Sequence, residues 1–383
     1  MKTEDLNEYV INIRRDLHRH PELSGQEVRT LGRICDELRK LQIPYDIVEG
    51  KNIVARIENG NGREIAIRAD FDALPVDEVT DVPWKSEKPG VMHACGHDAH
   101  TAALLGAAKL LLADKDAWKG TVYLCFQHGE EIGRGAGEIV SYLKENTNTD
   151  AVFGAHMMSI IPPGYAVLSP GIAAAGAFFF KIHIRGKGGH SGRPDLAFSA
   201  AEIMCDIYQN LLRIPTNHHE AASTCVICPC MLHAGNKANI IPESAEIEGT
   251  ARFLGTEDCS VIMDKIRTTA ELTAAVRGGS VTVEFEIMAK YPVVNDAMTT
   301  EAGQRAVNAA ELKLIQAPPS TASDNFAEYL HEFPGFFCFV GSKPDRPGTS
   351  GIHHAPDFDL DESAIAKTSW VFYETVKDLT ATK

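Results

Sequence analysis

The sequence lacks the long apolar run that would indicate a membrane-spanning segment. No stretch approaches the roughly 18 to 20 consecutive apolar residues that a transmembrane helix needs. Residues 1–16 are charged and amphipathic, without the apolar stretch of a secretory signal, so we expect a cytoplasmic protein. Basic residues are also few: 37 Lys and Arg stand against 52 Asp and Glu, for a formal net charge of −15. This balance argues against a nucleic acid or an anionic membrane surface as partner.

The sequence also lacks a disulfide framework. Its nine cysteines are odd in number and scattered, which is typical of reduced thiols in a cytoplasm. Cys225, Cys228 and Cys230 form a C-x-x-C-x-C cluster inside an apolar, strand-like run. Because no second pair stands at zinc-finger spacing, we interpret this cluster as packing rather than as a zinc or redox site.

What is present is a large chain of ordinary globular composition. Apolar residues make up 44% of the sequence and charged residues 23%, as in a typical soluble domain. A length of 383 residues exceeds the size at which one hydrophobic core normally divides. Two domains are therefore expected.

Three predicted strands are each followed by acidic or imidazole side chains. These strands and their polar residues are 65–68 with Asp70 and Asp72, 121–127 with His128, Glu130 and Glu131, and 151–154 with His156. Predicted helices 101–113 and 137–145 separate neighbouring strands, and this alternation predicts an α/β sheet. Because ligands bind at the carboxyl ends of the strands in such sheets, we expect these side chains to share one site.

A different pattern occupies residues 178–290. Its predicted elements are strand 178–185, helix 196–214, strands 223–230 and 245–253, helix 256–277 and strand 280–288. The order β-α-β-β-α-β is that of a ferredoxin-like domain. We therefore predict an α/β domain of residues 1–177 and 291–383, with a mixed sheet and helices on both faces. The α+β domain of residues 178–290 is inserted into it.

A Cys-x-His pair, Cys95 and His97, precedes the predicted helix 101–113. Alternate side chains of an extended loop point the same way, so this pair could bind one metal ion. A buried apolar cysteine beside a polar histidine is the ordinary alternative.

Further candidate ligands are Glu130, Glu131, His156 and His353 or His354. Thiolate, imidazole and carboxylate together suit zinc, cobalt or manganese better than calcium or magnesium. Five ligands suit two ions, roughly 3.5 to 4 Å apart, better than one catalytic ion with an open position.

The adjacent carboxylates Glu130 and Glu131 can divide their work. Neighbouring side chains past a strand end point in different directions, so one can bind metal while the other moves a proton from water to the leaving nitrogen. A Glu-Glu pair is more often a solvated turn. Here it follows an apolar strand at the predicted site, which favours the catalytic interpretation.

Several segments together carry a family resemblance that runs nearly end to end. They are Arg15–Leu23, Arg68–Pro75, Met92–His100, Phe126–Glu131, Gly188–Ser191, Ala238–Pro242 and His354–Phe358. In these segments the chain resembles the amidohydrolase branch of the co-catalytic metallopeptidases. That branch includes hippurate hydrolase, N-acetyldiaminopimelate deacetylase and the plant auxin–amino-acid conjugate hydrolases.

The resemblance implies a role for each candidate in the larger domain. The implied metal ligands are Cys95, His97, Glu131, His156 and His354, with Cys95 bridging both ions. Glu130 is the implied general base, and Asp72 the carboxylate that orients a ligand imidazole. His353 remains the alternative to His354. His128 stands where relatives usually have proline and adds an imidazole near the metals.

The resemblance also implies roles within the inserted domain. His190 is expected to reach into the site of a partner subunit and stabilise the developing oxyanion. Asn239 and Arg252 are expected to hold the carboxylate of the substrate, since arginine pairs with carboxylates in a bidentate geometry. By the same resemblance, residues 1–177 and 291–383 form the dinuclear metal catalytic domain, and residues 178–290 are a lid and dimerisation domain through which a homodimer forms.

Together these features predict a metal-dependent amidohydrolase that converts N-acyl amino acids, with acetyl or aromatic acyl groups, to a carboxylate and a free amino acid. The alternative is a dipeptidase or carboxypeptidase that uses the same two-metal site. The expected cofactors are two divalent ions, manganese first, with zinc and cobalt as the other candidates. A non-catalytic metal-binding protein would lack the base or part of the ligand set, and this sequence has both. Residues 133–137 are glycine-rich but match neither a Walker nor a dinucleotide-binding motif.

Overall fold

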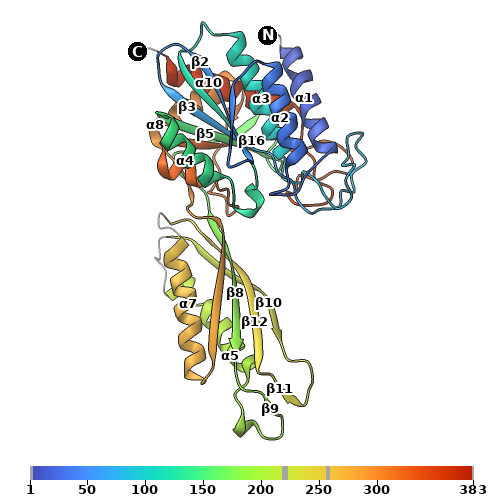
Figure 1. The fold of residues 1–383 in the computed structure, drawn as a ribbon, viewed down its shortest axis with the longest axis vertical. Helices are drawn as coiled ribbons and strands as arrows, with labels where there is room; N and C mark the ends of the chain where they lie inside the picture. The colour runs from blue at the N-terminus through green and yellow to red at the C-terminus, as the bar shows by residue number, and fades with distance from the viewer. Residues whose placement is uncertain (1–2, 218–222, 256–258, 382–383) are drawn as a thin grey trace. The chain divides into compact units, whose positions relative to one another are not determined.

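The computed structural model describes residues 3–217, 223–255 and 259–381 (Figure 1). The chain divides into two compact units. The first comprises Met1–Ala173, Val294–Pro318 and Glu328–Lys383, and the second Ala174–Val293 and Pro319–Ala327. Across the described ranges, none of the helices combines the length and the apolar character that crossing a bilayer requires.

The first unit is built on an eight-stranded mixed sheet with the order β1-β2-β4-β3-β5-β16-β6-β15. The strands are β1 (Tyr45–Val48), β2 (Asn52–Asn59), β3 (Glu64–Asp70), β4 (Gly120–Gln127), β5 (Ala151–Met158), β6 (Tyr165–Val167), β15 (Lys313–Leu314) and β16 (Gly335–Gly341). β3 runs parallel to both β4 and β5, and β5 runs parallel to β16. The carboxyl ends of these four strands therefore lie at one edge.

Helices cover both faces of this sheet. They are α1 (Thr3–Arg19), α2 (Val28–Lys40), α3 (His97–Ala113), α4 (Ala136–Asn146), α8 (Ala297–Ala309), α9 (Ala327–Glu332) and α10 (Ser363–Thr380). Along β4, Val122, Leu124 and Phe126 point into the core that α1, α3 and α10 share. Cys125 points to the opposite face, against which α4 packs.

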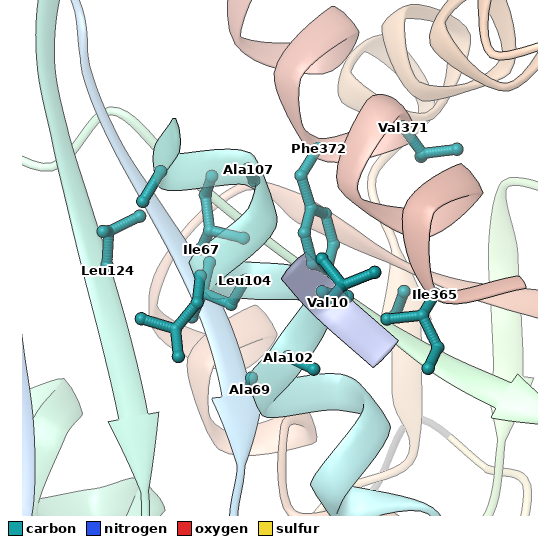
Figure 2. Close-up of a cluster of buried hydrophobic side chains, with 14 of the residues drawn as sticks. Val10, Ile67, Ala69, Ala102, Leu104, Ala107, Leu124, Ile365, Val371 and Phe372 are labelled. Carbon is teal, nitrogen blue, oxygen red and sulfur yellow. The ribbon is translucent and has the colours of Figure 1, made fainter. Parts of the chain in front are cut away.

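The core is centred on α3, which is buried nearly all round. An apolar helix without a polar face is expected at such a central position. Figure 2 shows Leu104 and Ala107 of α3 beside Ile67 of β3 and Phe372 of α10. This packing fixes the amino-terminal end of α3, where His97 stands, against the end of β3.

Among the element boundaries that differ from those predicted, one at α3 and one at β5 affect the site. α3 begins at His97 rather than at residue 101, because Gly96 adopts φ 89° and turns the chain. Cys95 and His97 therefore do not share one extended loop. β5 continues to Met158, so His156 lies within the strand, in register with Phe339 of β16.

The second unit contains a four-stranded antiparallel sheet with the order β10-β12-β8-β13. Its elements are β8 (Gly176–Arg185), β9 (Gly189–His190), α5 (Ala200–Leu211), α6 (Ile214–Asn217), β10 (Cys225–Ala234), β11 (Ile240–Ile241), β12 (Ser244–Phe253), α7 (Cys259–Val276) and β13 (Ser280–Ala289). The chain order and the sheet order together are those of a ferredoxin-like fold, as predicted. β7 (Gly171–Ala174) and β14 (Val293–Asn295) form a separate two-stranded sheet.

Some predictions for this second unit need correction. The first helix begins at Ala200 rather than at residue 196, because Phe198 and Lys187 exchange backbone hydrogen bonds. Residues 256–258 of the predicted second helix lie outside the described residues. The packing interpretation is wrong for Cys228 and Cys230, which are exposed on β10. It holds only for Cys225, which packs against the core.

Candidate metal centre

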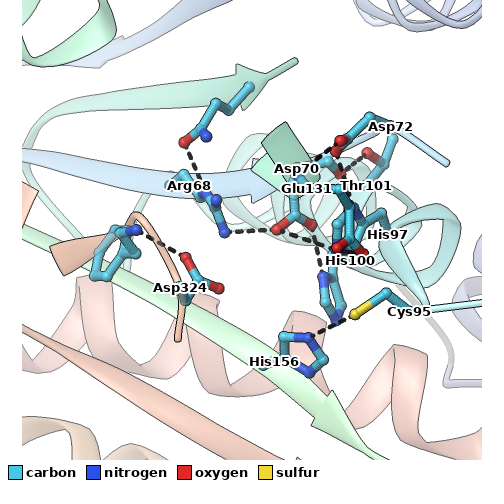
Figure 3. Close-up of polar contacts among 12 residues, drawn as sticks. Arg68, Asp70, Asp72, Cys95, His97, His100, Thr101, Glu131, His156 and Asp324 are labelled. Carbon is cyan, nitrogen blue, oxygen red and sulfur yellow. Dashed lines mark hydrogen bonds and ion pairs between the residues drawn. The ribbon is translucent and has the colours of Figure 1, made fainter. Parts of the chain in front are cut away.

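The polar ends of three parallel strands meet at one place in the first unit (Figure 3). The chain turns after β4 through Gly129 (φ 65°) into a short 3-10 helix, Glu130–Ile132, which carries both predicted glutamates. The loop before α10 brings in His354, whose backbone N donates to the carbonyl of Ala94 (2.8 Å). His354 has φ 66°, a left-handed conformation that is uncommon outside glycine and is often found at functional sites.

The five predicted ligands and Glu130 are brought together. Cys95 Sγ lies 3.4 Å from His156 Nε2, and Glu131 Oε1 lies 3.8 Å from His97 Nε2 and 3.4 Å from His354 Nε2. The donor atoms of Cys95, Glu131 and His354 all lie within 4.8 Å of one another. The same is true of His97, Glu130 and Glu131. Segments separated by more than 250 residues in the sequence thus share one cluster.

Two of the imidazoles are oriented by hydrogen bonds to their Nδ1 atoms. His97 Nδ1 donates to Asp72 Oδ1 (3.0 Å), and His156 Nδ1 donates to the carbonyl of Met157 (3.1 Å). A carboxylate or carbonyl can only accept, so Nδ1 carries the proton in each ring. Nε2 is then the atom available to a metal, which is the usual arrangement of metal-binding histidines.

Asp72 connects two parts of the cluster. Its Oδ1 orients His97, while its Oδ2 accepts from the backbone N of Glu131 (3.0 Å) and from the hydroxyl of Ser24 (2.7 Å). The side chain is almost completely buried. One carboxylate therefore fixes an imidazole and the turn that carries Glu131.

His100 was not among the predicted site residues, although its ring lies near those of His97 and His156. Its Nδ1 donates to Asp70 Oδ1 (2.7 Å), and its Nε2 accepts from the backbone N of Met157 (3.0 Å). With both nitrogens occupied, His100 positions β5 rather than offering a lone pair to a metal. The only signal in the sequence is its three-residue spacing from His97 on the same helix face.

His353 and His354 both approach Cys95. His353 is mostly buried, with Nδ1 3.9 Å from Cys95 Sγ and Nε2 3.0 Å from the hydroxyl of Ser159. His354 is half exposed and faces Glu131. The alternative left open by the sequence therefore has a physical basis, because the donor atoms of Cys95, His156 and His353 also lie within 4.8 Å of one another.

Burial and neighbouring charges control the protonation of the cluster. Burial raises the pKa of the Cys95 thiol well above its usual value, and the charge of Glu131 adds to this effect. Burial lowers the pKa of His156 well below its usual value. For His97, burial also lowers the pKa, but the interactions with Asp70, Cys95 and Asp72 together outweigh burial, and the pKa is raised well above its usual value. Since metal ligands bind in their deprotonated form, a cation here would compete with these protons.

One buried atom shows that the residues fit a cation. Glu131 Oε1 is buried and has no hydrogen-bond partner within the described part of the chain. A buried carboxylate oxygen without a partner is costly. A divalent ion among Glu131, Cys95 and His354 would remove that cost, and the thiolate, imidazole and carboxylate set is one that divalent transition metals accept.

Comparison with known proteins identifies the scaffold. Residues 66–378 match the model of peptidase family M20/M25/M40. The chain belongs to this family. An N-acetylcysteine deacetylase of Bacillus subtilis (strain 168) is 37% identical over 369 residues, covering 95% of this chain and 95% of the relative. A thermostable carboxypeptidase 2 of Saccharolobus solfataricus is 34% identical, covering 94% of this chain and 93% of the relative.

A solved structure supports the same assignment. A dinuclear metal-binding peptidase of family M20 from Bacillus subtilis matches with a TM-score of 0.84 at 33% identity, over 99% of this chain and 100% of that one. The predicted family and fold class are thereby confirmed. As a member of the M20 family, the chain is a hydrolase of amide bonds.

His128, which departs from the pattern usual in related sequences, lies outside the ligand cluster of this M20 chain. Its Nε2 is 3.3 Å from Glu138 Oε2, and its Nδ1 is 4.0 Å from Glu27 Oε2. Glu27 in turn accepts from the backbone N of Gly129 (2.9 Å). His128 therefore belongs to a polar group beneath the Glu130 turn.

The inserted unit places its three predicted residues in two groups. His190 of β9 is in register with Ile240 of β11, and the backbone N of Ser191 donates to the carbonyl of Asn239 (3.2 Å). His190 and Asn239 are thus neighbours. Arg252 lies near the end of β12 that is opposite to Ser244, about 26 Å along the strand at roughly 3.3 Å per residue. The Arg252 guanidinium donates to the carbonyl of Thr321. All three side chains are exposed or nearly so.

Proposed function

We propose that this M20-family protein is a two-metal amidohydrolase that cleaves the amide bond of N-acyl amino acids. The observation that carries the proposal is the meeting of Cys95, His97, Glu131, His156 and His354 beside Glu130. We assign catalysis to residues 1–177 with 291–383, and lid and dimerisation functions to residues 178–290. A cytoplasmic location stays a prediction from the charged amino-terminal segment.

The ligands divide between two ion positions in this proposal. Cys95, Glu131 and His354 would hold one ion, and Cys95, His97 and His156 the other. Bound there, the cations would polarise the acyl carbonyl and lower the pKa of a water molecule. Manganese is our first choice, and zinc and cobalt are the other candidates, since one thiolate among imidazoles and a carboxylate suits all three.

Glu130 and Asp72 supply the proton chemistry and its geometry. Glu130 takes a proton from the attacking water and gives it to the leaving nitrogen, which completes release of the amino acid. Asp72 keeps His97 and the Glu131 turn in place while this happens. Its support from Ser24 holds the carboxylate in one orientation.

His190 is suited to stabilise the oxyanion that forms at the acyl carbon. The backbone N of Gly192 donates to His190 Nδ1 (3.0 Å), so in the neutral ring Nε2 carries the hydrogen. An exposed Nε2–H is a ready hydrogen-bond donor. Asn239, its neighbour, would bind the carboxylate of the amino acid.

The separation of Arg252 from His190 and Asn239 supports a homodimer. Within one inserted unit, His190 and Asn239 lie at the β9–β11 end and Arg252 near the opposite end of β12, about 26 Å along the strand from Ser244, so they cannot bind the same small amino acid. In a dimer, Arg252 of one chain and His190 with Asn239 of the other can line one pocket. In this proposal, the dimer is therefore needed to complete the substrate pocket.

The substrate class follows from the relatives. The B. subtilis relative is named for deacetylation of N-acetylcysteine, which makes a small acyl group our first choice. The S. solfataricus relative is named as a carboxypeptidase, so peptide cleavage by the same centre is the second candidate. Both reactions break an amide next to a free carboxylate.

A substrate panel separates the two candidates. Metal-free protein would be reloaded with manganese, zinc or cobalt and given acetyl-, benzoyl- and long-chain acyl-amino acids beside dipeptides with a free amino terminus. We expect hydrolysis of the acyl-amino acids and little of the dipeptides. Faster cleavage of the dipeptides would replace the amidohydrolase by the peptidase alternative.

A further inference from the structure

The outer face of strand β10 carries two neighbouring thiols. β10 is an edge strand, paired in its sheet with β12 alone. Cys225 and Ile227 point toward the core of the inserted unit, whereas Cys228 and Cys230 are exposed on the opposite side. Residues two apart in a strand share a face, so the two thiols point the same way.

The geometry of this pair is close to that of a disulfide precursor. The two Sγ atoms are 3.8 Å apart, and the Cys230 thiol is 3.2 Å from the carbonyl of Cys228. Two residues of extended strand span about 6.6 Å, within the roughly 4.4 to 6.8 Å between Cα atoms that disulfides usually show. Pro229 pairs with Gly249 and Met231 with Glu248, so Cys230 is the extra residue of a β-bulge. The backbone at Cys230 can therefore adjust without breaking the register on either side.

A metal site is a weaker explanation for the pair. Tetrahedral thiolate sites need further ligands. Among the described residues, no third histidine, cysteine, aspartate or glutamate offers a ligand atom close to both thiols. Two exposed thiols in contact, without a third ligand, favour oxidation over metal binding.

We propose that Cys228 and Cys230 form a reversible oxidation site, which closes to an intrastrand disulfide by exchange with a low-molecular-weight disulfide. The thiolate of Cys228 attacks one sulfur of the oxidant, giving a mixed disulfide and one small thiol. Cys230 then attacks Cys228 Sγ, which forms the protein disulfide and releases the second small thiol. The two protein thiols lose two electrons, the oxidant gains them, and the two protons pass to the released thiolates.

The hydrogen bonding assigns the order of attack. The Cys230 thiol donates toward Cys228, and this hydrogen bond raises the pKa of Cys230. Because the thiolate is the nucleophile, Cys230, whose thiol proton is directed to the carbonyl and the sulfur of Cys228, is the resolving thiol and Cys228 the attacking one.

The chain supplies its own control thiol. Cys205, on α5, is also exposed, but it has no sulfur contact in the described part of the chain. Four other thiols, Cys35, Cys125, Cys259 and Cys338, are buried. Exchange with a small disulfide should therefore leave Cys205 as a mixed disulfide, while Cys228 and Cys230 join each other.

The test uses the reduced, metal-loaded full-length protein with oxidised glutathione as the probe. Peptide mapping by mass spectrometry should show Cys228 and Cys230 linked, with the peptide lighter by two hydrogens and no glutathione attached. Cys230→Ser should stop at a glutathione adduct on Cys228. Cys228→Ser should lose the disulfide and form its adduct more slowly, while Cys205→Ser should leave the Cys228–Cys230 disulfide unchanged.

Two results would overturn the proposal. One is glutathione remaining on both Cys228 and Cys230 in the wild-type protein. The other is a covalent dimer on a non-reducing gel in place of the intrastrand link. Circular dichroism of each variant checks that the inserted unit still folds. No readout depends on hydrolysis, so the amidohydrolase proposal can fail without affecting this one.

Discussion

The metal-ligand cluster of the first unit and the predicted substrate contacts of the second are built in opposite ways. At the candidate metal centre, His97 and His100 are buried and fixed by hydrogen bonds to the buried carboxylates Asp72 and Asp70. His190 and Arg252 are exposed or nearly so; His190 accepts a hydrogen bond from the backbone N of Gly192, and Arg252 donates one to the carbonyl of Thr321. The contrast shows that the side chains of the candidate metal centre are held in fixed orientations before a ligand binds, more than the predicted substrate contacts are. The candidate metal ligands gather at the strand ends of the first unit, whereas the predicted substrate contacts His190 and Arg252 lie on strands of the inserted unit, at its surface.

The largest effect should come from the base of the buried cluster. Glu130→Gln removes the proton acceptor while keeping the size of the side chain, so kcat should fall by about 10²- to 10⁴-fold. Metal content, measured by elemental analysis, should not change. Glu131→Gln is the matched variant and should lose metal as well as activity. Full turnover by Glu130→Gln would remove the general base from the mechanism.

The exposed region should show a smaller, purely catalytic effect. His190→Ala removes a donor to the oxyanion, and the expected loss in kcat is about 10²- to 10³-fold. Bound metal should stay the same, because His190 lies in the inserted unit. A mixture of His190→Ala and Glu130→Gln chains should recover part of the activity if each site draws His190 from a partner. The absence of recovery, with dimers present, would place His190 in its own chain's site.

Substitution of Asp72, a supporting residue in the buried region, should have a smaller effect than loss of the general base or of His190. Asp72→Asn keeps the shape but weakens the orientation of His97, so metal affinity should fall roughly 10- to 100-fold. Titration calorimetry with manganese measures this directly. An unchanged affinity would show that the imidazole is held by packing alone.

The smallest effect concerns stability and pH. Burial raises the pKa of Glu27 to about 6 from its usual 4.5. The unfolded chain therefore ionises first, and the free energy of unfolding should fall as pH rises from 4.5 to 6, by at most about 2 kcal/mol. Urea unfolding of metal-free protein should show this slope, and Glu27→Gln should flatten it. Glu271→Gln, exposed on α7, is the control in the other unit. An identical pH slope in Glu27→Gln would contradict the assignment.

Much of the site could be predicted because metal binding and proton transfer require particular residue types, which the sequence shows directly. Thiolate, imidazole and carboxylate side chains near the ends of apolar strands gave candidate ligands that the structure brings together, and the β-α-β-β-α-β order predicted the inserted fold. The contacts that orient those side chains could not be predicted. The role of His100 depends on Asp70 and Met157, which meet it only after β3, α3 and β5 have packed.

Local geometry was the other source of error. The spacing of Cys95 and His97 does not indicate that Gly96 adopts a left-handed conformation and that a helix begins directly after it. Likewise, the apolar run around Cys228 predicts a strand, but the sequence of that run does not show that Cys228 and Cys230 are exposed on it. Exposure of a strand face is decided by the neighbouring elements rather than by the strand itself.

The most direct test of the central claim is the crystal structure of the manganese-loaded protein with anomalous diffraction. We predict two separate anomalous peaks, one beside Cys95, Glu131 and His354 and the other beside Cys95, His97 and His156. A peak held by His353 in place of His354 would correct the ligand set. A single peak, or none among these side chains, would contradict the two-metal account.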